Sequence, residues 1–158
     1  MNVKFFHPGL AFKNHEEEYM SEIRRILSNG DLILRKDVED FEKSVAEYVG
    51  SKYCVALNSC TDALYLALRY LKIGPGDEVI VPSRTFVASA QVITQVGATP
   101  VFYDLDTNIA DLITDRTRAI IPVHIEGAFD TKFDEIMELA LFHEIDVIED
   151  AAQAFGAI

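Results

Sequence analysis

An acidic pair ends an apolar stretch near the end of the sequence. Ile145, Val147 and Ile148 precede Glu149 and Asp150, and small residues follow. This order is typical of a buried strand that carries a carboxylate at its C-terminal tip. In an open α/β sheet, ligands bind beyond the carboxyl ends of the strands, so Asp150 is well placed to face a ligand. Capping of the following turn is the alternative, and this stretch alone leaves both interpretations open.

Polar residues also follow the other strands that the sequence predicts. The predicted strands cover residues 53–57, 78–82, 100–104, 119–123 and 146–149. Asn58 with Ser59, Ser83 and His124 follow the first, second and fourth strands, and Asp104 ends the third. Because parallel strands end at the same edge of a sheet, we expect these residues to converge with Asp150 on one site. The alternative is that they only mark where strands meet solvent.

The segment 58–64 follows a strand and opens a helix. The free N–H groups at a helix start, with the Ser59 and Thr61 hydroxyls, could bind a phosphate. An ordinary N-cap explains the same residues. The sequence has no GxGxxG or Walker motif, which argues against a dinucleotide or a nucleoside triphosphate.

Two ring-bearing residues lie at other strand tips. Phe86 lies at the loop-to-helix step where a predicted helix begins, and it either stacks on a flat ligand or belongs to the core. His124 either hydrogen-bonds a ligand or satisfies the loop that turns at Gly127. With Asp150 and the phosphate site, these residues suit a flat ring that carries a phosphate and a nitrogen needing a carboxylate. Pyridoxal phosphate is such a ligand, because a nearby carboxylate raises the pKa of its ring nitrogen and keeps it protonated.

Strands and helices alternate after residue 50. Predicted helices cover residues 16–28 and 38–49, and later 61–71, 86–96 and 131–143, with a turn near 109–113. This alternation predicts an α/β fold, a mostly parallel sheet with helices on both faces, preceded by two N-terminal helices. We expect one structural domain overall, made of a helical segment (1–50) and the sheet region (51–158).

Composition excludes several classes of function. The chain has 158 residues, is 49% hydrophobic and carries a formal charge of -12, which argues against a nucleic-acid partner. Cys54 and Cys60 indicate no disulfide framework, and no spacing with histidines indicates a metal site. The sequence has no signal-peptide pattern and no apolar run of about 20 residues, so we expect a cytoplasmic protein without a membrane partner.

Five stretches together resemble one protein family, in family order and at family spacing. They are NSCTDALYLAL (58–68), GPGDEVIVPSRTFVASA (74–90), GATPVFYDLD (97–106), AIIPVHIEG (119–127) and VIEDAAQAFGA (147–157). The chain resembles the first part of DegT-type (DegT/StrS) sugar aminotransferases, pyridoxal-phosphate enzymes of fold type I. The sheet region would then be part of the large domain of such an enzyme.

The resemblance implies a role for each candidate residue. Asp150 would pair with the pyridine nitrogen, Gln153 would hydrogen-bond the phenolic oxygen and Phe86 would stack on the ring. The phosphate would lie at Ser59, Cys60 and Thr61, and His124 would lie near the cofactor. A nucleotide-linked keto-sugar would be the amino acceptor, glutamate or glutamine the donor, and a homodimer the working unit.

The sequence also departs from the family pattern. Cys60 stands where many members have glycine, Arg35 also replaces a glycine, Glu126 replaces a tyrosine, and the stretch 106–119 is short. The family's Schiff-base lysine lies beyond the EDAAQ motif, and this sequence has no lysine after Lys132. We therefore expect no catalytic residue in this chain and an N-terminal portion that is inactive alone.

Three readings of the function follow from these departures. The chain is part of a sugar aminotransferase, truncated or completed by a C-terminal polypeptide. It is instead a non-catalytic module that binds pyridoxal phosphate or a nucleotide sugar. In the third reading it belongs to a pyridoxal-phosphate-dependent sugar dehydratase.

The resemblance also bears on the sheet. In fold type I, two later strands separate strand 53–57 from the strand that ends at Asp150. Without them the sheet has unpaired edges. We therefore expect the chain to self-associate, to recruit a second polypeptide, or to pair strand 53–57 directly with strand 146–149.

Overall fold

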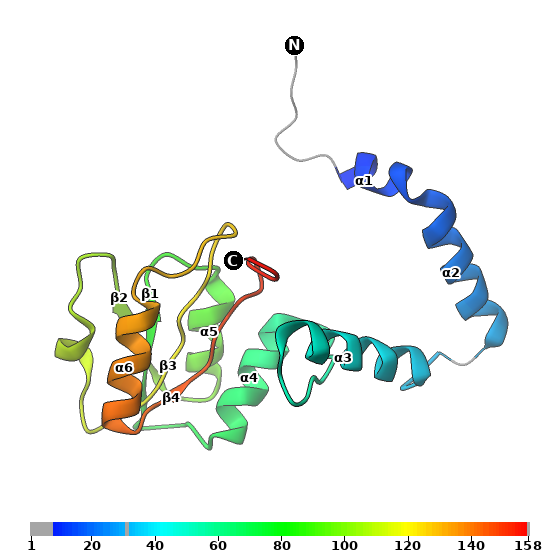
Figure 1. The fold of residues 1–158 in the computed structure, drawn as a ribbon. Coiled ribbons are helices and arrows are strands. Elements are labelled where there is room, and N and C mark those ends of the chain that lie inside the picture. Colours follow the sequence, from blue (N-terminus) through cyan, green and yellow to red (C-terminus); the bar gives the residue numbers. More distant parts are fainter. Residues whose placement is uncertain (1–7, 31, 158) are drawn as a thin grey trace, which may run out of the picture. The chain divides into compact units, whose positions relative to one another are not determined.

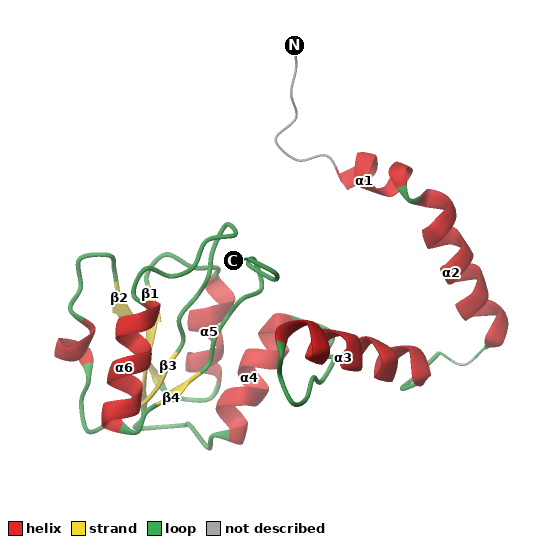
Figure 2. Ribbon diagram, in the orientation of Figure 1, coloured by secondary structure: helices red, strands yellow, loops and turns green. Residues whose placement is uncertain are grey.

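The computed structural model describes residues 8–30 and 32–157. The chain divides into two compact units, Met1–Ala56 and Leu57–Ile158. The first unit is helical in its described part, and the second contains the sheet, as Figures 1 and 2 show. Each unit is described by itself.

A parallel four-stranded sheet forms the centre of the second unit. Its strands run in the order β2, β1, β3, β4. Their bounds are Glu78–Pro82 for β1, Thr99–Tyr103 for β2, Thr117–Ile120 for β3 and Asp146–Val147 for β4. All five residues of β1 are buried, which is typical of a parallel strand covered on both faces and explains the apolar run at residues 79–82 that follows Glu78.

Helices cover both faces of this sheet. Side chains alternate along β1, so Val79 and Val81 pack on one face with α4 (Cys60–Tyr70) and α5 (Val87–Gln95). Ile80 packs on the opposite face with residues of α6 (Phe133–His143) and of the 3₁₀ helix η1 (Ile109–Leu112). The predicted α/β class, with a parallel sheet between helices, is confirmed.

The predicted first strand is wrong. Residues 53–57 form no strand, and Tyr53 and Val55 are about three-quarters exposed. Within the described ranges β4 pairs with β3 alone, so the direct pairing of 53–57 with 146–149, one of the three outcomes considered, does not occur. A β-favouring sequence becomes a strand only when another strand satisfies its N–H and C=O groups.

Two other strands are shorter than predicted. Strand β3 ends at Ile120 rather than at residue 123, and β4 has two residues. Beyond them a single parallel bridge joins Val123 to Asp150. The two chain segments therefore stay side by side up to the residue that the sequence singles out.

The first unit holds three helices in its described part. They are α1 (Pro8–Asn14), α2 (Glu16–Asn29) and α3 (Lys36–Val49); α2 and α3 were predicted, whereas α1 was not. Helices α2 and α3 end at Gly30 and Gly50, which adopt the left-handed conformation that glycine accepts without a Cβ clash. No helix in the described ranges is long and apolar enough to cross a membrane.

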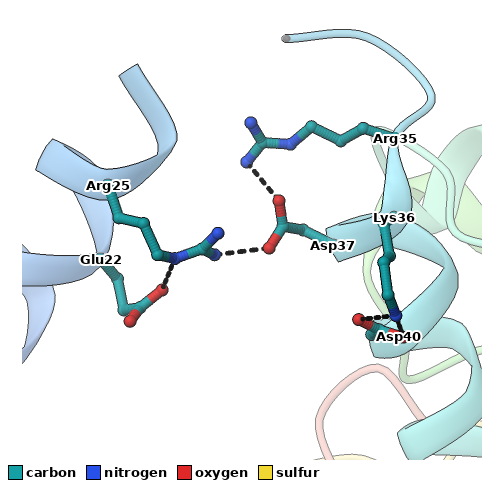
Figure 3. Close-up of polar contacts among 6 residues, drawn as sticks. All are labelled: Glu22, Arg25, Arg35, Lys36, Asp37 and Asp40. Carbon is teal, nitrogen blue, oxygen red and sulfur yellow. Dashed lines mark hydrogen bonds and ion pairs between the residues drawn. The ribbon is translucent and has the colours of Figure 1, made fainter. Parts of the chain in front are cut away.

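Ion pairs join α2 to α3 in this first unit. Arg25 of α2 contacts Glu22 on its own helix at 2.8 Å and Asp37 of α3 at 2.5 Å, and Arg35 also contacts Asp37, as Figure 3 shows. Lys36 pairs with Asp40 within α3. These side chains are partly or largely exposed except that of Arg35, so water and salt screen most of the pairs.

Candidate functional site

Backbone hydrogen bonds hold Asp150 between two segments at the carboxyl edge of the sheet. Its N–H donates to the Pro122 carbonyl at 3.0 Å, and its own carbonyl accepts from the N–H of His124 at 3.0 Å. The residue is only 6% exposed. Its position at a strand tip is therefore set by the parallel arrangement of the β3 and β4 segments.

Three donors surround the Asp150 carboxylate. The Ser89 hydroxyl donates to Oδ2 at 3.0 Å. The Ala152 N–H lies 3.2 Å from Oδ1, and the Cys60 thiol lies 3.6 Å from it. Burial, together with the negative charge of Asp150, raises the pKa of the Cys60 thiol, so that it stays protonated and able to donate. These contacts offset the cost of burying a carboxylate.

Six of the seven predicted binding residues line one cavity of about 160 Å³ beside this carboxylate. They are Cys60, Thr61, Phe86, His124, Asp150 and Gln153. The cavity lies where the N-terminal ends of α4 and α5 meet the loops after β3 and β4. Residues separated by up to 93 positions in sequence (153 minus 60) therefore share one surface.

Ser59 is the predicted residue that does not line the cavity. It is the N-cap of α4, where its hydroxyl accepts from the Asp62 N–H at 3.1 Å and donates to the Asp62 carboxylate at 2.9 Å. Its carbonyl accepts from the N–H of Ala63. The first amides of a helix have no acceptor within the helix, so those of Cys60 and Thr61 are the donors that α4 can offer to an anion.

Phe86 is 66% exposed and forms the N-cap position of α5. It lines the same cavity as Asp150, so the alternative that assigns it to the core is wrong. An exposed ring at the mouth of a cavity can stack on a planar ligand.

The side-chain amide of Gln153 has a defined direction. Its Oε1 accepts a hydrogen bond from the Glu126 N–H at 3.0 Å. This assignment leaves the NH₂ group of Gln153 as the donor that a ligand oxygen would receive. Glu126 also pairs with Arg84 at 2.9 Å, which joins the loops after β1 and β3.

His124 uses both ring nitrogens inside the protein. Its Nδ1 accepts from the Asp130 N–H at 3.0 Å, so the proton of the neutral ring lies on Nε2, which donates to Glu149 at 3.0 Å. The rings of Phe129 and Phe133 pack against it, with centroids 4.6 and 5.1 Å away. His124 thus borders the cavity while holding three loop segments together.

The expected convergence of strand-tip residues is partial. Asp104 does not line the Asp150 cavity but a neighbouring hollow of about 310 Å³, and its carboxylate accepts from the N–H of Leu105. Ser83 uses its N–H to bond the Tyr103 carbonyl. Neither Ser83 nor Asp104 therefore lines the candidate site, and their described bonds go to the end of β2 and to the residue after Asp104.

A larger hollow of about 450 Å³ lies at the opposite edge of the sheet. It is bordered by Asp77, Thr117 and Asp146, at the amino ends of the strands. Ligands of parallel α/β sheets bind at the carboxyl ends, so this hollow is not the candidate site. Within the described residues no group of three or more His, Cys, Asp or Glu side chains could hold a metal ion.

Sequence reasoning missed Ser89 and Thr85. The Ser89 hydroxyl lies 3.0 Å from Asp150 Oδ2 and 3.0 Å from the Thr85 hydroxyl. A serine on the otherwise apolar buried face of α5 was the available signal, because a buried hydroxyl requires a partner. Its partner follows 61 positions later in the sequence, so the pairing required the fold.

Comparison with known proteins identifies the family of the chain. A model of the DegT/DnrJ/EryC1/StrS aminotransferase family matches residues 13–158. The chain belongs to this family. The resemblance to DegT-type aminotransferases that the sequence motifs indicated is confirmed.

Relatives and solved structures of this family cover nearly the whole chain. The UDP-2-acetamido-2-deoxy-3-oxo-D-glucuronate aminotransferase of Pseudomonas aeruginosa is 44% identical over 143 residues, which is 85% of this chain and 40% of that protein. The crystal structure of DesV from S. venezuelae is 41% identical with a TM-score of 0.92, covering 98% of this chain and 43% of that one. The ntda protein of Bacillus subtilis, solved with bound cofactor PMP, is 30% identical with a TM-score of 0.85, covering 90% and 34%. The chain thus spans about 40% of the length of the curated relatives it matches.

Proposed function

We propose that this chain supplies the pyridoxal-phosphate-binding part of an aminotransferase that acts on a nucleotide-linked keto-sugar. One observation carries the proposal: a buried carboxylate, an exposed aromatic ring and an oriented amide donor line the same cavity. Family membership and the names of the relatives support the same conclusion.

The residues present fit the cofactor. Asp150 is an ionisable group that would pair with the ring nitrogen, Phe86 would stack on the ring and the Gln153 amide would donate to the phenolic oxygen. The N-terminus of α4, at Cys60 and Thr61, would hold the phosphate. When bound, pyridoxal phosphate supplies an electron sink for the carbanion that forms during amino transfer.

The residues of this chain would bind the cofactor and orient it. Asp150 would hold a proton on the ring nitrogen, because a carboxylate beside a cation stabilises the charged form. The Glu126 N–H fixes the direction of the Gln153 amide. No lysine of the described residues lines the cavity, so we expect the chain to hold the cofactor by non-covalent contacts.

The substrates and the assembly are part of the proposal. The name of the Pseudomonas relative specifies a UDP-linked 3-oxo sugar, which supports a nucleotide-linked keto-sugar as amino acceptor. Glutamate or glutamine would be the donor. The working unit would be a homodimer or a complex with a C-terminal polypeptide, and the free thiols of Cys54 and Cys60 suit a reducing cytoplasm.

Cofactor binding by the full chain tests the proposal. Titration with pyridoxal phosphate, followed by absorbance, should saturate, and Asp150→Ala should raise Kd at least about 10-fold because the ring nitrogen loses its charged partner. Asp150→Asn preserves the size of the side chain and should weaken binding in the same direction. Asp104→Ala removes a carboxylate outside the cavity and should leave Kd unchanged.

Borohydride reduction adds a second measurement. We expect no stoichiometric adduct on any one lysine, since no lysine in the described part of the chain borders the cavity. Saturable binding that survives Asp150→Ala, or a single reduced lysine adduct, would contradict the proposed site.

A further inference from the structure

We propose that Ser89 is a positioning residue for the proposed cofactor: its hydroxyl fixes the Asp150 carboxylate toward a protonated aromatic nitrogen, and Thr85 fixes the hydroxyl. The inference rests on the proposed function for the identity of the ligand. The contacts that carry it belong to this chain alone.

Ser89 is buried in a helix face that is otherwise apolar. It is 1% exposed, and its buried neighbours on α5 are Ala88, Val92 and Ile93. Burying a hydroxyl among apolar side chains is unfavourable unless the hydroxyl has partners. It has two, the Thr85 hydroxyl and Asp150 Oδ2, each at 3.0 Å.

The direction of this hydrogen-bond chain follows from proton counting. An ionised carboxylate only accepts, so the single proton of Ser89 is donated to Asp150. Ser89 must then accept from Thr85. The order Thr85 to Ser89 to Asp150 is therefore fixed, and it orients the Ser89 proton before any ligand binds.

The two oxygens of Asp150 differ in their remaining capacity. Among the described contacts, Oδ1 receives the Cys60 thiol and the Ala152 N–H, whereas Oδ2 receives Ser89. A carboxylate oxygen accepts about two hydrogen bonds. Oδ2 thus retains an acceptor position, and among the described contacts Ser89 is the donor that holds this oxygen.

The physical consequence is specific to a ligand with a protonated ring nitrogen. Without the Ser89 hydroxyl the carboxylate is held through Oδ1 alone, by the Cys60 thiol and the Ala152 N–H, so the position of Oδ2 is less ordered before binding and ordering it would cost affinity. A ligand that makes no hydrogen bond to Asp150 does not gain from that ordering. The loss of affinity on removing the Ser89 hydroxyl should therefore depend on whether the ligand has a ring nitrogen.

Two ligands and three variants of the full chain test this inference. The ligands are pyridoxal phosphate and its analogue with carbon in place of the ring nitrogen. Ser89→Ala should raise the Kd of pyridoxal phosphate roughly 10-fold, as expected for one hydrogen bond to a charged group, and leave that of the analogue unchanged. Ser89→Thr keeps the hydroxyl and should restore most of the affinity for pyridoxal phosphate. Thr94→Ala, which removes an exposed hydroxyl bonded to Gln91 on the same helix, should change neither Kd.

A readout without ligand separates this inference from the proposed function. The ¹³C resonance of the Asp150 carboxyl should shift in Ser89→Ala and return in Ser89→Thr. An unshifted resonance, or an equal loss of affinity for both ligands, would overturn the positioning role. If the parent chain binds neither ligand, the proposed function fails, and the ligand assigned to Asp150 here fails with it.

Discussion

The two units of the chain bury their apolar side chains to different degrees. In the sheet-containing unit, Leu68, Ile80, Ile120 and Ile136 have no exposed surface. In the helical unit, Ala46 is the buried apolar residue among those described, and Leu27 remains 61% exposed. Helices in both units nevertheless carry apolar residues at helical spacing.

This difference shows what an amphipathic pattern establishes. The pattern predicts where a helix forms, but burial requires a second apolar surface. In the second unit the sheet supplies one on each face, through alternating residues such as Val79 and Ile80. The candidate site therefore stands on elements that are fixed by a packed core.

The largest expected effect comes from truncating a leucine in each unit. Leu68→Ala in α4 removes fully buried methyl groups and should lower the free energy of unfolding by about 2–5 kcal/mol. Leu27→Ala in α2 should change it by less than about 0.5 kcal/mol. Urea unfolding, followed by amide signals of the substituted helix, measures each value. Equal losses in both helices would contradict the comparison.

A pair of glycines sharpens the comparison at the backbone. Gly97 and Gly50 both have positive φ, so alanine strains either position by about 1 kcal/mol. A Cβ at Gly97 would also lie 2.9 Å from Pro75 Cγ, whereas at Gly50 it meets nothing within 4 Å. Gly97→Ala should therefore lower the free energy of unfolding, measured by thermal unfolding, by about 2–3 kcal/mol, and Gly50→Ala by about 1 kcal/mol. A larger loss at Gly50 would show that the close packing at Pro75 is not decisive.

A buried tyrosine should matter at alkaline pH. The Tyr103 hydroxyl donates to Asp130, whose backbone N–H holds His124 beside the site. Burial first, and then the bond to Asp130, raises the pKa of Tyr103 well above its ordinary value. The neutral phenol thus stabilises the fold below pH about 10, and this contribution is lost as the pH rises beyond that value.

Removing that hydroxyl tests the contribution. Tyr103→Phe should lower the free energy of unfolding at pH 8 by about 1–2 kcal/mol and flatten its decline above pH 10. Tyr19→Phe, in a half-exposed tyrosine of α2, should leave the free energy of unfolding at pH 8 nearly unchanged. If the free energy of unfolding of Tyr103→Phe still declined as steeply above pH 10, a group other than Tyr103 would be responsible for the decline.

Much of the second unit could be predicted from its sequence. Continuous apolar runs gave strands β1 and β2 within one residue at each end, and helical periodicity gave α4, α5 and α6 within about two. These patterns involve residues close together in the sequence, so they can be recognised without knowledge of the tertiary structure. The prediction of a strand at 53–57 was wrong because strand formation depends on a partner strand that the local sequence does not reveal.

The candidate site divides in the same way. Asp150 and Phe86 could be found because strand tips and helix starts are recognisable positions along the chain. Ser89 could not, because its role depends on which tip lies opposite α5. The engaged ring nitrogens of His124 likewise follow from contacts with Asp130 and Glu149 that no sequence pattern encodes.

The smallest expected effect concerns the ion pair between α2 and α3. The hydrogen bond from Arg25 is the main cause that lowers the pKa of Asp37, and the charges of Arg25 and Arg35 add to it. A lowered carboxyl pKa contributes stability that is present above its ordinary value near 4 and is lost as the pH falls below it. The Arg25 and Asp37 side chains are partly exposed, so salt should weaken the contribution.

Asp37→Asn removes this pair while keeping the side-chain size. We expect a change in the α2 and α3 amide signals at low salt that fades in 1 M salt, where the Debye length is about 3 Å. Asp40→Asn is the matched control, because Asp40 pairs with Lys36 inside α3 and does not join two helices. It should leave the α2 signals unchanged. If Asp37→Asn perturbed the helices as strongly as Leu68→Ala perturbs α4, exposed charges rather than a packed core would organise the helical unit, and the contrast between the two units would not hold.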